Sequence, residues 1–242
     1  MLRLLIDAGN SNIKLAQVEG EQWQPVRVLP VSRADALEDF FPAADVVCEV
    51  WISNVAGSTV GERIRTVCAA RGWTANFIAS QATQCGVRNC YTQPLSLGTD
   101  RWASLIAAWA LQKRACLVVG SGTATTIDAL SDTGEFLGGL ILPGIALMQR
   151  ALAGATAQLQ VAGGEYPAFP QNTADAMSRG ALLATCGAIG LQYARLAASD
   201  AQVLLCGGAA PLLAEHLNLP LQVQDNLVLQ GLLIIAREGG GI

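Results

Sequence analysis

This sequence has almost no histidine, and its cysteines do not occur in closely spaced pairs. It has one histidine, His216, and its seven cysteines include no Cys-x-x-Cys pair. Zinc sites and Ser-His-Asp triads need these residues, so their scarcity argues against both kinds of site. An odd, scattered set of cysteines in an apolar chain is typical of reduced, mostly buried thiols in a cytoplasm. The alternative is a redox pair formed by Cys85 and Cys90, which flank a polar loop.

Charge is also scarce. Charged residues make up 14% of the chain and hydrophobic residues 52%, against a charged share of roughly 25% in typical domains. This balance suggests that another subunit covers part of the surface. The net charge is −4 and no run of Lys or Arg occurs, which argues against nucleic acid as a partner. No apolar run reaches the roughly 18 residues of a membrane span, so we expect a cytoplasmic protein with neither signal peptide nor anchor.

A polar turn lies between two apolar segments near the start of the chain. Leu4–Ile6 is typical of a buried strand and Ile13–Val18 of the strand that returns beside it. In the turn, Gly9 would let a phosphate chain approach backbone N–H groups. Asp7 could hold Mg²⁺, mostly through water, and Lys14 could add a positive charge. The alternative is a surface turn with one solvated aspartate.

The second half of the chain repeats this pattern. The segment from Leu117 to Asp128 again has an apolar strand, a small-x-Gly-hydroxyl turn and a returning strand. Gly122 then corresponds to Gly9, and Gly120 corresponds to Asp7. Internal self-similarity indicates a duplicated architecture. Two phosphate-binding hairpins facing one another across a cleft are the device of the actin, hexokinase and Hsp70 superfamily, a fold-level analogy.

A second motif precedes an apolar helix. Thr99 fits the N-cap of that helix and Asp100 its first turn, where the helix dipole favours a negative charge. Ordinary capping would explain both residues. The functional interpretation is that Asp100 accepts a proton from an alcohol that attacks the γ-phosphate. Arg101 could pair with an anionic group of the substrate or with a neighbouring carboxylate.

The last third of the chain predicts a long helix and a glycine turn. Thr173 is the expected N-cap of the helix. Its apolar residues at positions 182, 186, 189, 193 and 196 have the spacing of a packed seam, for which core packing and a dimer contact are the two interpretations. Gly207 and Gly208 then follow an apolar strand, where they could admit a nucleotide base or form a tight turn.

Together these motifs resemble one family. The set Asp7-Ala-Gly-Asn-Ser-Asn-Ile-Lys14, Gly98-Thr-Asp-Arg101, Gly122-Thr-Ala124, Gly138-Gly-Leu-Ile-Leu-Pro-Gly144 and Asn172-Thr173 is similar to that of type III pantothenate kinases. The family also carries proteins described as Bvg accessory factors. The resemblance implies ATP-dependent phosphorylation of pantothenate to 4′-phosphopantothenate, the first step of coenzyme A biosynthesis. It also implies a homodimer of chains with two ribonuclease-H-like domains and an active site in the cleft between them.

The resemblance also implies site residues and cofactors. ATP with Mg²⁺ would be bound by Asp7, Ala8, Gly9, Asn10, Ser11, Asn12, Ile13, Lys14 and Thr123, with Asp7 at the metal. Pantothenate would be bound by Tyr91, Gly98, Thr99, Asp100, Arg101 and Thr173, with Asp100 as the catalytic proton acceptor. The family usually binds a monovalent cation, K⁺ or NH₄⁺, with an aspartate where this chain has Gly120. We therefore expect activity to depend little on that cation.

The sequence thus predicts an α/β protein with ribonuclease-H-like domains at residues 1–115 and 116–242. Its predicted function is that of a pantothenate kinase. A catalytically silent member that binds a ligand and acts through protein contacts is the alternative, and Gly120 is the residue that favours it. A sugar kinase of the same superfamily ranks third, because the short chain has no inserted sugar-binding domain.

Overall fold

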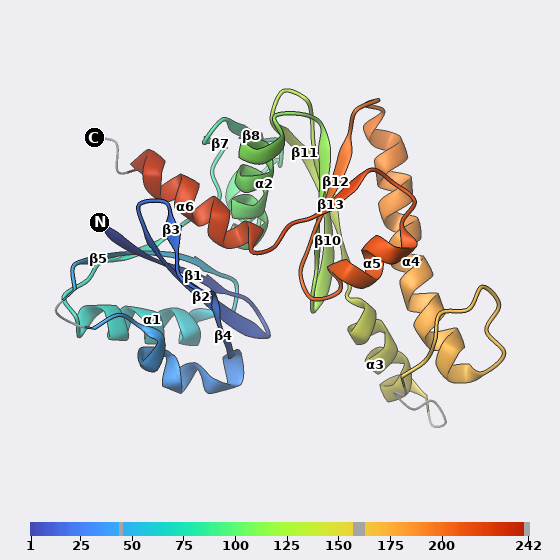
Figure 1. Cartoon of the computed structure of the whole chain (residues 1–242), viewed down its shortest axis with the longest axis horizontal. Helices are drawn as coiled ribbons and strands as arrows, with labels where there is room; N and C mark the ends of the chain where they lie inside the picture. Colours follow the sequence, from blue (N-terminus) through green and yellow to red (C-terminus); the bar gives the residue numbers. More distant parts are fainter. Residues whose placement is uncertain (44–45, 157–162, 240–242) are drawn as a thin grey trace. The chain divides into compact units, whose positions relative to one another are not determined.

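The chain folds into two compact α/β units (Figure 1). The computed structural model describes residues 1–43, 46–156 and 163–239. The first unit comprises Met1–Leu111 and Asn226–Ile242, and the second comprises Gln112–Asp225. This division differs from the predicted one at the C-terminus. Helix α6 (Leu227–Gly239) belongs to the first unit because its buried leucines pack against strands at the start of the chain.

The first unit contains a mixed sheet with the strand order β3-β2-β1-β5-β6, and β4 also pairs with β2. The strands are β1 (Leu2–Ala8), β2 (Asn12–Glu19), β3 (Gln22–Trp23), β4 (Arg27–Pro30), β5 (Cys48–Asn54) and β6 (Ala75–Phe77). Strands β1 and β2 form an antiparallel hairpin, whereas β5 and β6 run parallel to β1. The predicted hairpin is therefore confirmed.

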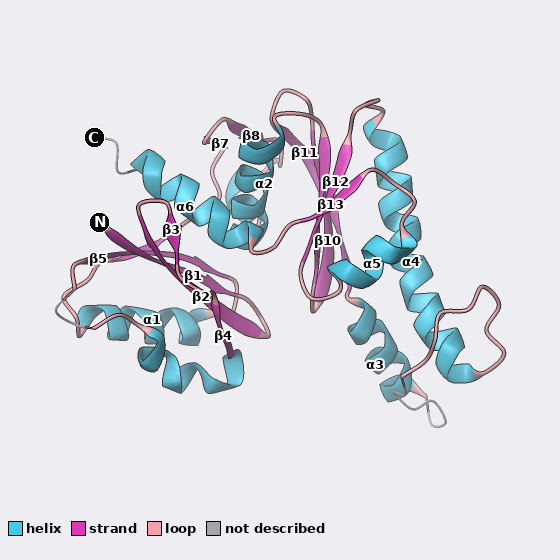
Figure 2. Ribbon diagram, in the orientation of Figure 1, coloured by secondary structure: helices cyan, strands magenta, loops and turns pink. Residues whose placement is uncertain are grey.

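Side chains alternate between the two faces of this sheet, as in any strand. Leu4 and Ile6 belong to a core formed with helix α1 (Ser58–Ala69). Leu5 belongs to a different core, in which helix α6 covers the sheet. Figure 2 shows α1 and α6 on opposite faces of the strands. Asp7 continues the face of Leu5, so its side chain projects on the same face as α6.

The second unit repeats this topology. Its strands follow the order β13-β12-β9-β10-β11, with β9 (Cys116–Ser121), β10 (Ala124–Leu130), β11 (Glu135–Pro143), β12 (Gln202–Cys206) and β13 (Leu221–Val223). Strand β9 is antiparallel to β10 and parallel to β12, as β1 is to β2 and β5. Helices α3 (Ile145–Ala155), α4 (Thr173–Leu196) and α5 (Ala210–His216) lie on one side of this sheet (Figure 2). The duplication predicted from the two hairpins is confirmed.

Two connecting segments of the first unit have short elements of their own. The segment Val31–Phe40 forms the 3₁₀ helix η1. The loop over residues 81–97 contains the small hairpin of β7 (Thr83–Gln84) and β8 (Val87–Asn89), followed by the 3₁₀ turn η2 (Pro94–Ser96). The hairpin turn has positive φ at Cys85 and Gly86. Glycine favours such a φ and cysteine does not, so only Gly86 marks this turn in the sequence.

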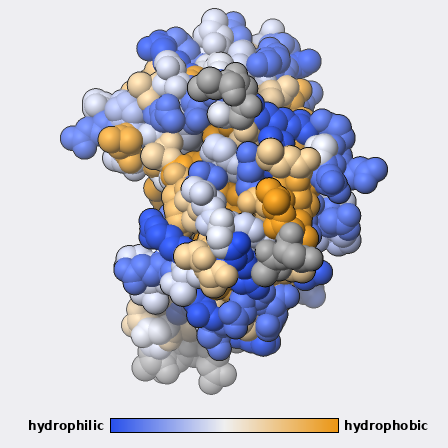
Figure 3. All heavy atoms as spheres, turned by 90° about the vertical axis from the view of Figure 1, so that its left-hand side faces the viewer, coloured by the Kyte–Doolittle hydropathy of each residue, from blue (hydrophilic) through white to orange (hydrophobic). Residues whose placement is uncertain are grey.

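Helix α2 (Thr99–Gln112) follows that loop and is buried without interruption from Arg101 to Ala108. The seam predicted on α4 lies mainly in the core, where Leu182 and Ile189 are buried. No helix in the described parts of the chain is both long and apolar enough to cross a membrane. Figure 3 shows apolar residues scattered among hydrophilic ones on one face of the molecule.

Candidate active site

The turn between β1 and β2 is built around Gly9. Its N–H donates to the carbonyl oxygen of Asn12 over 3.1 Å, and a Cβ at Gly9 would lie 3.3 Å from the same oxygen. A side chain there would therefore crowd the turn. Asn10, Ser11 and Asn12 are exposed, whereas Ala8 and Ile13 are buried in the strands. The exposed residues 10–12 of the predicted ATP-binding segment are thus accessible to a ligand, while the buried residues on either side fix the segment in the sheet.

Asp7 is at the end of β1, between Lys14 on β2 and Ser53 on β5, both of which are its register partners. The pKa of Asp7 is raised from 3.8 to about 7. Burial is the largest cause, the negative charge of Asp100 acts in the same direction, and the positive charge of Lys14 opposes the shift. Asp7 and Asp100 therefore lie close enough to repel one another. A carboxylate in this situation gains from binding a proton or a cation.

The surroundings of Asp7 fit Mg²⁺ bound together with a phosphate ligand. Among the residues that the structure describes, no cluster of three or more His, Cys, Asp or Glu side chains could hold a metal ion. Mg²⁺ takes one or two carboxylates and completes its shell with water and substrate phosphates. Asp7 can supply one carboxylate of that donor set. The described residues do not offer enough side chains to hold a metal ion without a phosphate ligand and water.

The segment before α2 places Asp100. The carbonyl oxygen of Gly98 accepts the first helical hydrogen bond, from the N–H of Trp102 over 3.0 Å. Gly98 therefore caps the helix, and the expectation that Thr99 does so is wrong. Asp100 accepts a hydrogen bond from the N–H of Arg101 through Oδ1 over 2.8 Å. A Cβ at Gly98 would lie 2.6 Å from that Oδ1, so a side chain at this position would displace the carboxylate of Asp100.

Arg101 and Tyr91 are in contact. Arg101 is only 7% exposed, and its Nη1 donates to the Tyr91 hydroxyl over 3.2 Å. Its guanidinium carbon lies 5.8 Å from the centre of the Tyr91 ring. The loop that carries Tyr91 is held by Asn89, whose side chain accepts from the N–H of Tyr91 and donates to the carbonyl of Pro94. The fold thus brings together two residues that were predicted to bind pantothenate.

Thr123 is exposed at the tip of the second hairpin, between β9 and β10. Its carbonyl oxygen accepts a hydrogen bond from the N–H of Gly144 over 2.9 Å. A Cβ at Gly144 would lie 2.8 Å from the same oxygen and would clash with Gly122. The chain at Pro143–Gly144, where β11 ends, therefore packs against the turn between β9 and β10 and holds it in place. The first hairpin is one residue longer, because Asp7 pairs with Lys14 whereas Gly120 pairs with Thr126.

The position that corresponds to Asp7 has no carboxylate. Gly120 pairs with Thr126 on β10 and with Cys206 on β12. A Cβ at Gly120 would lie 3.1 Å from Thr126 Oγ1 and 3.8 Å from Cys206 Sγ. Asp128 is two residues further along β10, is buried, and pairs with Val118 and Gly139. It therefore occupies a different level of the sheet from Gly120.

Two further expectations concern the second unit. Thr173 is exposed and is the first residue of α4, but its predicted role as N-cap is wrong. Asn172 is the N-cap, because its side chain accepts a hydrogen bond from the N–H of Asp175 over 2.9 Å. Gly207 has φ +94°, and a Cβ there would clash with the carbonyl of Ser121. The Gly207–Gly208 pair thus forms a tight turn against the second hairpin.

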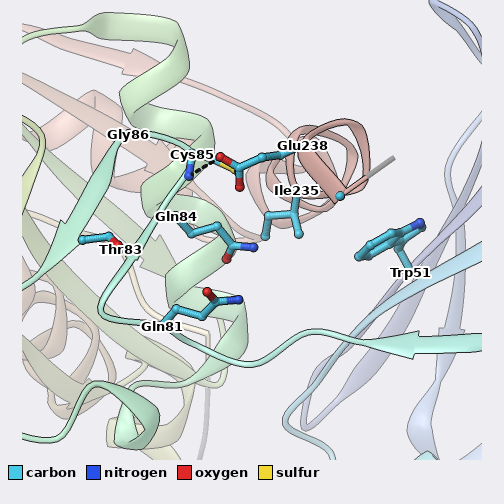
Figure 4. A pocket seen from close by; sticks show the side chains of 9 residues that line it. Trp51, Gln81, Thr83, Gln84, Cys85, Gly86, Ile235 and Glu238 are labelled. Carbon is cyan, nitrogen blue, oxygen red and sulfur yellow. Dashed lines mark hydrogen bonds between the residues drawn. The ribbon is translucent and has the colours of Figure 1, made fainter. Parts of the chain in front are cut away.

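A pocket in the first unit contains none of the predicted site residues. It measures about 550 Å³, and its lining includes Trp51, Gln81, Gln84, Cys85 and Glu238. Figure 4 shows Glu238 of α6 beside the turn of the β7–β8 hairpin. Glu238 accepts from the N–H of Cys85 over 3.0 Å and from its thiol over 3.1 Å. Burial and this carboxylate raise the pKa of Cys85 to about 12, so its thiol is a poor nucleophile. None of the seven cysteines, all of which are in the described parts of the chain, forms a disulfide bond.

Comparison with solved structures identifies the fold. A Campylobacter jejuni protein assigned to the Baf family of transcriptional activators is 25% identical, with a TM-score of 0.66 over 99% of this chain and 100% of that one. A Sinorhizobium meliloti protein assigned as a 2-dehydro-3-deoxygalactonokinase is 15% identical, with a TM-score of 0.61 over 99% and 100%. The second likeness is one of fold alone. With the duplicated sheet, these neighbours confirm the predicted α/β fold of the actin, hexokinase and Hsp70 superfamily.

Comparison of sequences identifies the family. A protein of Aromatoleum aromaticum described as a type III pantothenate kinase is 47% identical over 236 residues, which are 97% of this chain and 98% of that protein. The profile of the type III pantothenate kinase family matches residues 3–195, a range that includes every predicted site residue. The chain belongs to the type III pantothenate kinase family.

Proposed function

We propose that this protein is a kinase that transfers the γ-phosphoryl group of ATP to the terminal hydroxyl of pantothenate. The product is 4′-phosphopantothenate, and the reaction is the first step of coenzyme A biosynthesis. The observation that carries the proposal is the 47% identity to a curated pantothenate kinase over nearly the whole of both chains. The arrangement of Asp7, Asp100 and Arg101 in the first unit supports it, because carboxylates and a cation of this kind could serve phosphoryl transfer.

The first hairpin would bind the phosphates of ATP. Its exposed turn offers backbone N–H groups and small polar side chains, and Lys14 on β2 adds a positive charge beside Asp7. Asp7 would hold Mg²⁺, which neutralises phosphate charge when it is bound with ATP. The loose transition state of phosphoryl transfer depends mainly on such positioning and neutralisation. Thr123, on the second hairpin, stays a predicted nucleotide contact.

Asp100 would accept the proton of the attacking hydroxyl. Oδ1 of Asp100 accepts a hydrogen bond from the N–H of Arg101, and we assign Oδ2 as the acceptor of the substrate proton. Arg101 is a buried cation next to Tyr91, and pantothenate carries a carboxylate that such a cation could bind. We propose that Arg101 and Tyr91 fix that end of the substrate, so that the other end reaches Asp100. Thr173 remains a predicted contact of the substrate.

A silent accessory protein is the competing function, and the lack of a carboxylate at Gly120 is what favours it. The curated relatives are described as kinases, and this chain has Asp7, Asp100, Arg101 and Thr123 at the predicted site positions. The description of the C. jejuni protein as a transcriptional activator concerns that protein. Gly120 weakens only the monovalent-cation site. We therefore keep the kinase as the proposal.

We further propose that the protein is a cytoplasmic homodimer. Helix α4 exposes Leu183 (50%) and Leu191 (66%) on the same face as Gly180 and Gly187. The spacing of these residues is three, four and four, which places them on one side of a helix. Small residues let another helix approach closely, and exposed leucines gain from being covered. A second copy of the chain would cover this face.

The test of the proposed function is a direct assay. Purified protein is incubated with Mg²⁺, ATP and pantothenate, and phosphopantothenate is measured by mass spectrometry. N-acetylglucosamine and glucose are assayed in parallel. We expect turnover of pantothenate only. ATP-dependent phosphorylation of a sugar instead would favour the sugar kinase, and binding of ATP and pantothenate without turnover would favour the silent member.

A further inference from the structure

Neighbouring parallel strands of the first unit end in polar side chains. Asp7 on β1 and Ser53 on β5 are register partners. Beside β5, strand β6 ends at Phe77, and Ser80 follows shortly after it. Ligands of α/β sheets bind at the carboxyl ends of parallel strands. Ser53 and Ser80 are therefore at the same edge of the sheet as Asp7, although neither was predicted from the sequence.

Both serines are closed to solvent. Ser53 is 0% exposed and Ser80 is 1% exposed. A buried hydroxyl is costly unless it has a hydrogen-bond partner, and both serines have one. Ser53 Oγ lies 2.9 Å from the hydroxyl oxygen of Thr99, and Ser80 Oγ donates to the carbonyl of Leu97 over 2.8 Å. The two partners are separated in sequence by Gly98 alone.

The chain between these partners needs external support. Gly98 has no side chain with which to restrict its backbone. The carboxylate of Asp100 lies against Gly98, because a Cβ at Gly98 would be only 2.6 Å from Oδ1 of Asp100 and would displace it. The direction of that carboxylate therefore depends on the backbone of Gly98. The serines hold this backbone from both sides, one through Thr99 and one through Leu97.

We propose that Ser53 and Ser80 are positioning residues of the phosphoryl transfer, which fix the segment Leu97–Thr99 and thereby the carboxylate of Asp100. Because they are closed to solvent, they act through this segment without touching a substrate. The inference rests on the proposed function. Its physical basis is that a misplacement of about 1 Å at a reacting group can cost roughly 100-fold in rate.

Alanine variants test the two serines. We expect Ser53→Ala and Ser80→Ala to lower kcat by about 10–100-fold, with little change in the KM for ATP. Ser53→Thr retains the hydroxyl, and its branched side chain suits a strand, so it should recover most of the rate. The matched control is Ser178→Ala, which removes a serine hydroxyl that is 1% exposed and bonded to Gln149, and which should keep wild-type kcat.

A double-mutant cycle tests the route. Thr99→Val removes the hydroxyl from the other side of the Ser53 bond at nearly constant volume. If Ser53 acts through Thr99, the kcat of Ser53→Ala/Thr99→Val should match that of the poorer single variant. If the fold-losses in kcat of the two single variants multiply in the double variant, then Ser53 does not act through Thr99. Wild-type kcat in Ser53→Ala and Ser80→Ala, or an equal loss in Ser178→Ala, would overturn the inference as well.

Two measurements keep this inference separate from the proposed function. Turnover of pantothenate by the wild-type protein tests the function alone. Hydrogen exchange of residues 97–102 needs no substrate, and both alanine variants should accelerate it while Ser178→Ala does not. Unchanged exchange would overturn the inference even in an active enzyme. If Ser53→Ala does not fold by thermal melting, the kcat and exchange of Ser80→Ala decide the outcome.

Discussion

Asp7 and Lys14 are directly opposite one another in the β1–β2 ladder, yet the positive charge of Lys14 does not lower the pKa of Asp7 below its ordinary value. Burial and, to a smaller extent, the charge of Asp100 raise the pKa of Asp7 to about 7 against the opposing effect of Lys14. The first hairpin therefore holds a carboxylate that is stabilised by protonation or by a bound cation. This situation suits a group that must bind a metal together with a nucleotide, and it has a measurable cost in the empty protein.

That cost gives a pH dependence of stability without metal or ATP. An aspartate with a raised folded-state pKa stabilises the fold fully below its unfolded pKa of 3.8, and this contribution is lost as pH rises through about 7. We therefore expect wild-type thermal stability to fall from pH 5 to pH 8. Asp7→Asn removes the titration, so the fall should be smaller in this variant. Equal falls in melting curves of the two proteins would contradict the assignment.

Asp100→Asn separates catalysis from helix capping. An asparagine retains a side-chain oxygen that can accept from the N–H of Arg101, so the local geometry should survive. We expect turnover to fall by roughly 10²–10⁴-fold, because the amide is not a base, while ATP binding stays nearly intact. Initial rates and calorimetric titration with ATP measure the two effects.

Thermal melting supplies the control for that variant. Loss of a charge in the first turn of a helix costs only about 0.3–1 kcal/mol, so the melting temperature should change little. If the Asp100→Asn enzyme folds and keeps nearly wild-type turnover, then Asp100 is not the catalytic base. Its role would be to stabilise the first turn of α2.

The sequence predicted what depends on local pattern. Each hairpin has an apolar strand, a glycine turn and a returning strand, so periodicity and turn chemistry suffice to locate Asp7 and Thr123. The duplication followed because the same pattern occurs twice. Both strands of the first hairpin and those of the second formed at nearly the predicted residues.

What depends on distant contacts could not be predicted. Ser53 follows an apolar strand just as Asp7 does, but its importance comes from Thr99, 46 residues away in sequence. The N-caps moved one residue, from Thr99 to Gly98 and from Thr173 to Asn172, because hydroxyl and amide side chains both suit such positions. Helix α6 joined the first unit because its leucines match the face of Leu5, a match that no local pattern encodes.

The proposed dimer predicts that α4 is sensitive to charge. Leu191→Glu places a carboxylate on a face that a second copy would bury, so it should shift the protein from dimer to monomer. The matched control is Val28→Glu, at a residue 52% exposed on β4 of the first unit, which should keep the wild-type mass. Light scattering after gel filtration measures the mass. A wild-type monomer, or a dimer that Leu191→Glu leaves intact, would contradict the interface.

The last prediction concerns Gly120, which has neither a carboxylate nor any other side chain. A monovalent cation there would have only carbonyls, hydroxyls and water to balance it, with Thr126 as the nearest hydroxyl. We therefore expect activity to depend little on K⁺ or NH₄⁺, in contrast to the family pattern. Initial rates are compared in Na⁺, K⁺, NH₄⁺ and a bulky organic cation at constant ionic strength, because screening alone alters the binding of charged substrates. Strong activation by K⁺ or NH₄⁺ would refute the prediction.

Gly120→Asp is the converse experiment, and the structure admits it. The Cβ would lie 3.1 Å from Thr126 Oγ1 and 3.8 Å from Cys206 Sγ, so the hydroxyl must yield by only a few tenths of an ångström. The φ of Gly120 is not positive, so the backbone tolerates a side chain. The new carboxylate would occupy the position that Asp7 holds in the first hairpin. It should create activation by K⁺ where the wild-type protein has none, while Gly120→Asn, of similar size but uncharged, should not.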